Sequence, residues 1–394
     1  MTRQKDVERG ASRLIIDATT ALTDVVEAMH HNIVRGPFGA VSPGAERFTH
    51  GRTRGLTGLV YGSIRSITRV AGSGLDRLLE GRAEPLDAPT SRRRDILVAA
   101  LNGVVGDHLA RTGNPLASPM DFRREGRSLD LSRAALAESF PSATSKVLVL
   151  VPGSCMSERL WLRGGHDHGQ ALARDLGFSP VYLRYNSGLH IGHNGAAFAV
   201  LLRRLVGAWP VPIDDLVLLC HSMGGLVARS ALDLDPTLPV RRMVFLGTPH
   251  HGSPLERTGN ILHTVLGSGP YTAPLSRLGR LRGAGITDLR HGTIDAPPAA
   301  HARVHPAPDM RRPVPLPAGV ACYAVAASLG TTPIAAAVGD GLVPVDSALG
   351  RHARPELSLD LPPERCHVVR GRGHMDLIDD AEVYAQLVRW LGGR

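Results

Sequence analysis

Apolar runs of strand length alternate with amphipathic stretches through the second half of the chain. The apolar-rich runs lie at residues 147–151, 181–185, 216–220, 243–246, 320–326 and 366–369. Continuous apolar runs of this length are typical of strands buried on both faces of a parallel sheet. Between them, residues with helical spacing lie at 169–176, 195–208, 223–232 and 381–391. This alternation predicts an α/β fold with a doubly wound, mostly parallel sheet.

The first part of the chain has a different pattern, in which apolar residues recur every three or four positions. This spacing predicts helices near residues 14–29, 56–79 and 95–111. We therefore expect an N-terminal helical region at residues 1–145 and an α/β domain at residues 146–394. The helices either pack on that domain or another subunit, or form a surface that contacts a membrane or a partner. Both explanations stay open.

A long segment at residues 252–318 interrupts the alternation between two predicted strands. It contains a periodic stretch near residues 255–281 and a Pro- and His-containing loop at residues 296–317. An insertion at this point overhangs the carboxyl ends of the strands, where sheets of this kind place their sites. We expect a cap or lid, with surface decoration as the alternative.

Composition narrows the classes of protein that remain. The chain has 394 residues, of which 43% are hydrophobic, so it is not a disordered protein. Aromatic residues make up only 4%, which argues against base-stacking platforms for RNA. The net charge of +9 comes almost entirely from scattered arginines, and the densest run is Arg92 to Arg94. Nucleic-acid binding is therefore not expected. The excess of arginine reflects either a compositional bias of the genome or attraction to anionic lipid head groups.

Nothing in the sequence predicts secretion, a membrane span or a metal site. The N-terminus lacks the apolar region of a signal peptide, and no uninterrupted apolar run approaches the ~18 residues of a spanning helix. The four cysteines lie in or beside apolar runs without a C-x-x-C pair, and we interpret them as buried thiols. A helix start explains His166, Asp167 and His168 better than metal binding. We expect a cytoplasmic protein, with peripheral membrane contact through the N-terminal helices as an open addition.

One apolar run ends in a turn that carries a candidate nucleophile. Residues 216–220 lead into Ser222, and a helical pattern of apolar residues follows. A serine at the tip of a strand–turn–helix unit is typical of a nucleophile elbow, where neighbouring side chains must be small. Gly224 and Gly225 satisfy this need on one side. On the other side, Cys220 stands where the pattern usually has glycine.

A serine hydroxyl needs a base within hydrogen-bond reach and an acid that orients this base. In a unit of this kind, the acid and the histidine follow the nucleophile in chain order. Asp340 lies in a glycine-flanked turn after a predicted strand, and His374 lies in a glycine-rich loop before the last helix. We predict that Ser222 is the nucleophile, that His374 is the general base and then acid, and that Asp340 orients the imidazole.

Other residues compete for the acid and base roles. The alternative acids are Asp295, Asp309, Asp346 and Asp376. The alternative base is His367, which we expect to be a core residue because it lies within a predicted strand.

The oxyanion of an acyl-transfer intermediate needs two backbone N–H donors. The first is expected from Met223, which follows the nucleophile. The second is expected from the loop after the strand at residues 147–151, where Gly153 permits a close approach. We predict Ser154 as this donor and keep Cys155 as the alternative.

Two of these motifs resemble those of α/β-hydrolase lipases and esterases. Residues 151–161 resemble the His-Gly oxyanion loop of that superfamily, with Pro152 in place of the usual histidine. Residues 220–225 resemble the Gly-His-Ser-Met-Gly-Gly elbow, with Cys220 in place of the first glycine. Neither departure removes a catalytic group.

Three further motifs extend the resemblance. Residues 246–254 are similar to the Gly-Thr-Pro-His-x-Gly element of triacylglycerol lipases and GPI inositol-deacylase-like lipases. Residues 339–344 and 373–374 match the acid and histidine segments of the superfamily. The resemblance covers about residues 146–394 and implies an α/β-hydrolase fold that needs no cofactor and acts on an ester or acyl bond. His250 and His251 are then expected to shape the pocket floor or to pack behind the elbow.

These observations predict a serine hydrolase that cleaves carboxylic esters. Lipid or other apolar acyl substrates are favoured because the insertion is rich in Leu, Ile and Val. One alternative is an acyltransferase or polyester depolymerase with the same triad. Another is a non-catalytic membrane or scaffold protein that acts through its helical region. The sequence does not predict the oligomeric state.

Overall fold

The computed structural model describes residues 92–252, 284–289, 292–295, 311–332 and 338–393. The helices predicted at residues 14–29 and 56–79, and most of the insertion at residues 252–318, lie outside the described residues. The chain divides into two compact units, and residues 89–110 with 117–394 form the unit that contains the sheet.

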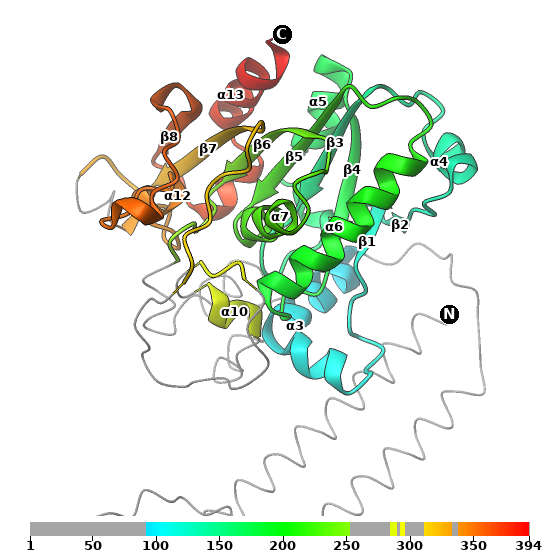
Figure 1. Ribbon diagram of the computed structural model, residues 1–394, viewed down its shortest axis with the longest axis horizontal. Helices are drawn as coiled ribbons and strands as arrows, with labels where there is room; N and C mark the ends of the chain where they lie inside the picture. Colours follow the sequence, from blue (N-terminus) through cyan, green and yellow to red (C-terminus); the bar gives the residue numbers. More distant parts are fainter. Residues whose placement is uncertain (1–91, 253–283, 290–291, 296–310, 333–337, 394) are drawn as a thin grey trace, which may run out of the picture. The chain divides into compact units, whose positions relative to one another are not determined.

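An eight-stranded sheet lies at the centre of this unit (Figure 1). The strands are β1 Asp121–Arg124, β2 Arg127–Ser128, β3 Lys146–Val151, β4 Ser179–Arg184, β5 Asp215–His221, β6 Val240–Leu246, β7 Ala321–Ser328 and β8 Cys366–Arg370. They lie in the order β2-β1-β4-β3-β5-β6-β7-β8. Strands β3 to β8 are parallel, whereas β1 is antiparallel to both β2 and β4. The predicted α/β fold with a mostly parallel sheet is therefore confirmed.

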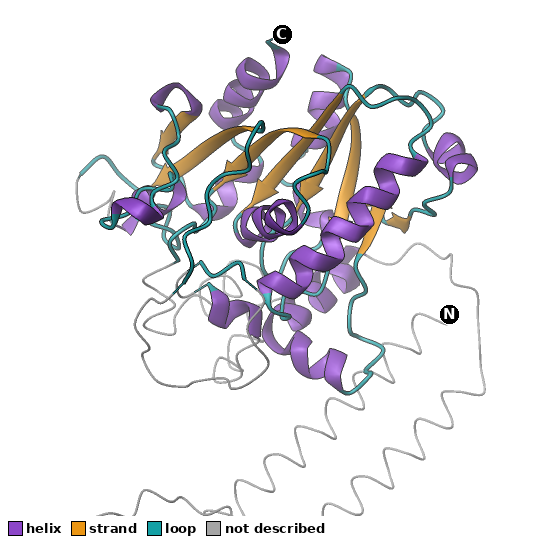
Figure 2. Ribbon diagram, viewed as in Figure 1, coloured by secondary structure: helices purple, strands orange, loops and turns teal. Residues whose placement is uncertain are grey.

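Helices cover both faces of the sheet (Figure 2). The α-helices are α3 Arg92–Arg111, α4 Arg133–Ser139, α5 His168–Leu176, α6 Ile191–Ala208, α7 Met223–Leu234, α10 Ala284–Asp288, α12 Val345–Ala348 and α13 Ala381–Gly392. The 3₁₀-helices are η2 Glu158–Trp161, η4 Pro355–Leu357, η5 Pro363–Arg365 and η6 His374–Ile378. Helices α6 and α7 cover one face, and α5 and α13 cover the other. None of the described helices has both the length and the hydropathy needed to cross a bilayer.

The continuous apolar run in β3 follows from this layering. Val147 and Val149 pack in the core beneath α6 and α7, whereas Leu148 and Leu150 pack in the core beneath α5 and α13. All four side chains are fully buried. Because successive residues of a strand point to opposite faces, a strand covered on both sides has no polar position.

Residues 121–128 form two strands that the sequence pattern placed in a helical region. Strand β1 pairs antiparallel with β4, so that Phe122 lies opposite Leu183. Its sequence is Asp-Phe-Arg-Arg and shows no apolar run, because a charged residue, Arg123, takes one of its buried positions. The Arg123 guanidinium donates to both carboxylate oxygens of Asp121 at 2.9 Å. The sheet thus begins before the boundary expected at residues 145 and 146.

The connections of the sheet reverse direction between β3 and β5. From β3 the chain proceeds to β4 on one side, and from β5 it proceeds to β6 on the other. The carboxyl ends of the two strands are adjacent, with Val151 opposite Cys220. Parallel sheets place their ligand sites at such a switch point. The loops that follow β3 and β5 therefore meet where a site is expected.

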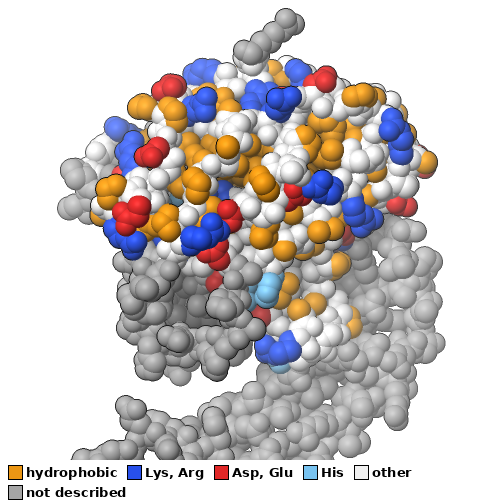
Figure 3. Space-filling view, in the orientation of Figure 1, with side chains coloured by type: hydrophobic (Ala, Val, Ile, Leu, Met, Phe, Trp, Pro, Cys, Tyr) orange, Lys and Arg blue, Asp and Glu red, His pale blue; other side chains and the backbone are white. Residues whose placement is uncertain are grey.

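The cysteines are free thiols, and charges of both signs are mixed on the surface that Figure 3 shows. Cys155, Cys220 and Cys322 are buried free thiols, and Cys366 is half-buried. On the face seen in Figure 3, Lys and Arg side chains are interspersed with Asp and Glu over the described part of the surface.

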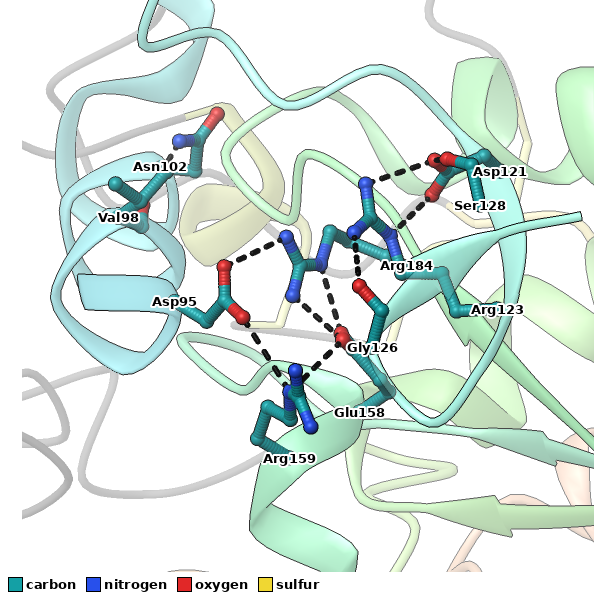
Figure 4. Close-up of polar contacts among 10 residues, drawn as sticks. All are labelled: Asp95, Val98, Asn102, Asp121, Arg123, Gly126, Ser128, Glu158, Arg159 and Arg184. Atoms are coloured by element: carbon teal, nitrogen blue, oxygen red, sulfur yellow. Dashed lines mark hydrogen bonds and ion pairs between the residues drawn. The ribbon is translucent and has the colours of Figure 1, made fainter. Parts of the chain in front are cut away.

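A buried ion-pair network joins α3 to the sheet (Figure 4). The Arg184 guanidinium donates to both oxygens of Glu158, at 2.7 and 2.5 Å, and to Asp95 Oδ1 at 3.0 Å. Arg159 Nε lies 3.4 Å from Asp95 Oδ2. The exposed fractions of Asp95, Glu158 and Arg184 are 4%, 6% and 8%. Two cations balance two anions, and burial of the group is tolerated only while all partners are present.

We expect Glu158→Gln to destabilise the protein strongly. The substitution keeps the shape of the side chain but leaves a net positive charge in the buried network. Removing one partner of a buried pair costs about 3–5 kcal/mol of unfolding free energy. Urea unfolding measures this loss. Glu356→Gln is the matched control because Glu356 pairs with Arg354 at the exposed surface, and it should leave the midpoint unchanged. Equal midpoints for both variants would contradict the prediction.

Candidate active site

Ser222 lies at the tip of the turn between β5 and α7. Its backbone has φ 52° and ψ −128°, a sparsely allowed conformation for a residue with a side chain. Its amide donates to Leu246 O at 2.9 Å, and its carbonyl accepts from Gly225 N at 3.1 Å. These bonds hold the strained turn, and the predicted strand–turn–helix unit is present around Ser222.

The two glycines after the turn allow α7 to pass close to the neighbouring strands. A Cβ on Gly224 would lie 2.4 Å from Val151 O, and a Cβ on Gly225 would lie 2.2 Å from Thr248 Oγ1. On the other side of the turn, Cys220 is fully buried. Burial raises the pKa of its thiol well above the usual value, so the side chain stays neutral and packs as a small apolar group.

A buried histidine and aspartate lie beside this turn. His374 Nδ1 is 2.7 Å from Asp340 Oδ2. Asp340 Oδ1 accepts from the amides of Leu342 and Val343 at 2.9 and 2.8 Å. The amide of His374 also donates to Asp340 O at 3.0 Å. The carboxylate is thus held by fixed donors, and its second oxygen faces Nδ1 of His374, which fixes the orientation of the imidazole ring.

The rival acids lie in other environments. The Asp346 side chain is 73% exposed and pairs with Arg351, and Asp376 pairs with Arg163. Asp295 pairs with Arg312. Asp309 lies outside the described residues.

The rival base is also engaged elsewhere. His367 Nε2 is 2.9 Å from Glu382 Oε1, and the His367 side chain is half-buried. The core position predicted for His367 is therefore wrong. Its strand, β8, is the last in the order of the sheet and presents this residue to the Glu382 carboxylate on α13.

The glycine of the Gly-Thr-Pro-His element makes room for the histidine–aspartate pair. Gly247 has φ 58°, which favours glycine. A Cβ at this position would lie 3.2 Å from both Asp340 Oδ2 and His374 Cε1, and 2.8 Å from Leu377 Cδ1. A side chain at residue 247 would therefore crowd the pair and collide with Leu377.

The loop after β3 approaches Ser222 from the other side. A Cβ on Gly153 would lie 2.9 Å from Ser222 Cβ, so only glycine permits this approach. The amide of Cys155, the alternative oxyanion donor, already donates to Ser187 Oγ at 3.0 Å. Ser154 lines the pocket that contains Ser222 and stays the candidate donor. Met223, the other predicted donor, follows Ser222 as the first residue of α7.

Ser222 and His374 open onto one pocket, whose empty space including its mouth is about 430 Å³. The other residues that line it are Ser154, Met156, His221, Pro249, Leu289, Leu342, Val343 and Met375. Most of these side chains are apolar. Leu289 belongs to the insertion at residues 252–318, most of which lies outside the described residues, so a cap or lid stays a prediction.

His221 has a supporting role that sequence reasoning missed. Its Nε2 lies 3.2 Å from His374 O, and its Nδ1 lies 3.1 Å from Met156 Sδ. Burial lowers the pKa of His221 well below its usual value, and the neighbouring His374 adds to this effect. The neutral ring donates from Nε2 and fixes the backbone of His374. The position of His221 directly before Ser222 was the signal in the sequence that could have indicated this role.

The residues after β4 hold loops together. Tyr185 Oη donates to Pro152 O at 2.9 Å, and Ser187 accepts from the oxyanion loop as described. His190 Nδ1 lies 3.1 Å from Asp288 Oδ2 on α10. Their hydrogen bonds connect this loop to the oxyanion loop and to α10.

His250 packs behind the elbow. Its ring is edge-on to Phe245 at 4.7 Å, and its Nδ1 lies 3.3 Å from Arg229 Nη1 on α7. Burial lowers the pKa of His250 well below its usual value. His168 Nε2 lies 3.1 Å from Leu377 O, and the described residues contain no group of His, Cys, Asp and Glu side chains suited to a metal ion.

Comparison with known proteins gives one family match. A family model described as a PGAP1-like alpha/beta domain matches residues 205–268, the segment that contains Ser222. No curated protein is detectably similar to the chain in sequence.

Solved structures show a distant likeness. The mature form of lipase BlEst2 from Bacillus licheniformis matches 62% of this chain and 91% of its own, with 18% identity and a TM-score of 0.42. Esterase RhEst1 from Rhodococcus sp. ECU1013 matches 64% and 92%, with 15% identity and a TM-score of 0.37. Carboxylesterase CesB from Bacillus subtilis matches 64% and 85%, with 15% identity and a TM-score of 0.37. TM-scores this low carry no argument about activity.

The geometry of the chain and the family match agree on the kind of fold. The elbow follows β5 at the switch point of a mostly parallel sheet, and the family model covers that elbow. The histidine–aspartate pair follows later in the chain, as the order of α/β-hydrolases requires. The described chain has an α/β fold of the α/β-hydrolase kind, and its residues 205–268 match a PGAP1-like alpha/beta domain.

Proposed function

We propose that this protein hydrolyses carboxylic esters through a serine acyl-enzyme. One observation carries the proposal: the strained Ser222 lines the same apolar pocket as His374, which is bonded to the buried Asp340. A hydroxyl at a strained turn beside an imidazole that a carboxylate orients is the arrangement that activates serine as a nucleophile.

The reaction follows from the positions of these groups. Ser222 Oγ attacks the ester carbonyl carbon while His374 Nε2 accepts the hydroxyl proton. Asp340 stabilises the imidazolium, and the amides of Ser154 and Met223 donate to the oxyanion. The intermediate collapses when His374 returns the proton to the leaving alcohol. A water molecule then attacks the acyl-enzyme by the same route and releases the acid and the free serine.

The lining of the pocket supports an apolar acyl group. Met156, Leu289, Leu342, Val343 and Met375 line its wall and offer no charged partner to an acyl chain. Burying each methylene of a chain there contributes about 0.8 kcal/mol. We therefore infer that lipid or other apolar esters are the substrates.

A panel of p-nitrophenyl esters with increasing acyl length tests this function. We expect kcat/KM to rise from acetate to medium-length chains, by about threefold to fourfold per methylene while the chain stays within the pocket. A maximum at acetate would contradict the apolar preference. Adding an alcohol acceptor and measuring free acid against new ester separates hydrolysis from acyl transfer, and an excess of new ester would overturn the assignment as a hydrolase.

A further inference from the structure

Helix α3 lies directly against the loop that carries one of the proposed oxyanion donors. A Cβ on Gly103 would lie 2.1 Å from Cys155 Sγ and 3.0 Å from both Cα and N of Cys155. Two of these atoms belong to the backbone, so only glycine allows the contact. Cys155 itself has φ 61°, a conformation that costs about 1–3 kcal/mol and persists only where neighbours enforce it.

The same segment of α3 contacts the loop after β4. Asn186 Nδ2 donates to Gly106 O at 2.8 Å. A Cβ on Gly188 would lie 2.2 Å from Asn102 O, so these backbones also touch. This second loop contributes Ser187, whose Oγ accepts the amide hydrogen of Cys155. Helix α3 therefore supports the oxyanion loop directly and through its neighbour.

The buried ion-pair network fixes the start of α3 relative to both loops. Glu158 follows Cys155 by three residues, and Arg184 directly ends β4 before the second loop. Both are bonded to the Asp95 network shown in Figure 4. The helix then bends at Val105, where φ is −130° and ψ is 20°, between its two glycine contacts. The bend lies where the helix passes the two loops.

We propose that α3 is a positioning element of the active site, and that its Gly103–Gly106 segment sets the place of the Ser154 amide. The inference rests on the proposed function, because it assigns a role within the same acyl transfer. Oxyanion donors act over a narrow range of distance, and loss of one such donor costs ~10²–10³ in kcat. A displaced donor should cost less, on the order of tenfold.

The test compares Gly103→Ala with Gly207→Ala. Both changes add one methyl group to a helix, but a Cβ on Gly207 of α6 would meet no atom within 4 Å. We expect Gly103→Ala to lower kcat about tenfold, where kcat is calculated per active site that reacts with a fluorophosphonate. KM should change less than about threefold, because the donor acts on the transition state. Gly207→Ala should retain the wild-type kcat. The double variant Gly103→Ala, Cys155→Gly should recover part of the activity, because glycine removes the Sγ that lies 2.1 Å from the new methyl group and suits a positive φ, whereas the backbone contacts at 3.0 Å remain.

A second variant keeps the inference testable if Gly103→Ala does not fold. In Gly106→Ala the new methyl meets the end of the Asn186 side chain, at 1.9 Å, which can turn away and break its bond to α3. We expect a smaller but measurable loss of kcat per titrated site. Active sites are titrated with a fluorophosphonate, so unfolded protein is not counted.

The outcomes separate this inference from the proposed function. If the wild type reacts with the fluorophosphonate and turns over esters, but both α3 variants keep its kcat per site, the positioning role is wrong. A lower melting temperature with unchanged kcat per site would also overturn it, since α3 would then support only stability. If the wild type neither reacts nor turns over, the proposed function itself fails.

Discussion

Ser222→Ala is expected to lower kcat for ester hydrolysis by about a millionfold, as loss of the nucleophile does in serine hydrolases that use a triad. The elbow should still form, because the turn is held by backbone bonds to Leu246 and Gly225 and not by the serine hydroxyl. The remaining rate would come from the oxyanion donors and the pocket alone. Fluorophosphonate labelling followed by mass spectrometry of the Ser222 peptide measures the nucleophile directly.

Ser139→Ala provides a matched control for this result. Ser139 ends α4 and does not line the pocket, so labelling and turnover should equal those of the wild type. Equal labelling of Ser222→Ala and the wild type would show that another residue reacts. Absence of labelling in the wild type would favour the non-catalytic scaffold that the sequence left open.

Asp340→Asn is expected to lower kcat by about 10⁴-fold while the protein stays folded. The reason lies in the two amides of Leu342 and Val343, which both donate to Asp340 Oδ1. They require an acceptor there, so the asparagine oxygen takes this position and its NH₂ group faces His374. The imidazole must then accept at Nδ1 and carry its proton on Nε2, where it cannot receive the proton of Ser222.

The control for this variant is Asp346→Asn. The Asp346 side chain is 73% exposed and pairs only with a surface arginine among the described residues, so kcat should be unchanged. Steady-state kinetics with circular dichroism measures both variants. A loss smaller than tenfold in Asp340→Asn, or a large loss in Asp346→Asn, would assign the orienting carboxylate to another residue.

The apolar pattern predicted the central strands of the sheet but not the outer strand β1. Apolar runs located β3 and β5 to within one residue at each end, because strands covered on both faces have no polar position. The same rule missed β1, where buried Arg123 is neutralised by Asp121. A buried charge with its partner looks like a surface charge in a sequence, and only the fold brings the two together.

The candidate site divides in a similar way. Ser222, Asp340 and His374 were predicted from the residues of their turns, which are local signals, and from their order along the chain. The supporting role of His221 was not, because its bond to His374 O joins residues 153 positions apart. The environment of His367 was also missed, since the carboxylate that binds this strand residue comes from helix α13.

By itself the sequence determined the alternation of strands and helices, the elbow at Ser222 and the order of the groups around it. These features depend on the backbone preferences and the apolar spacing of neighbouring residues. Only the tertiary structure decided that the Cys155 amide is occupied and that Gly103 of α3 touches the same loop. Contacts between residues far apart in the sequence depend on how the sheet and its helices pack. No local pattern of residues encodes which of them come close in space.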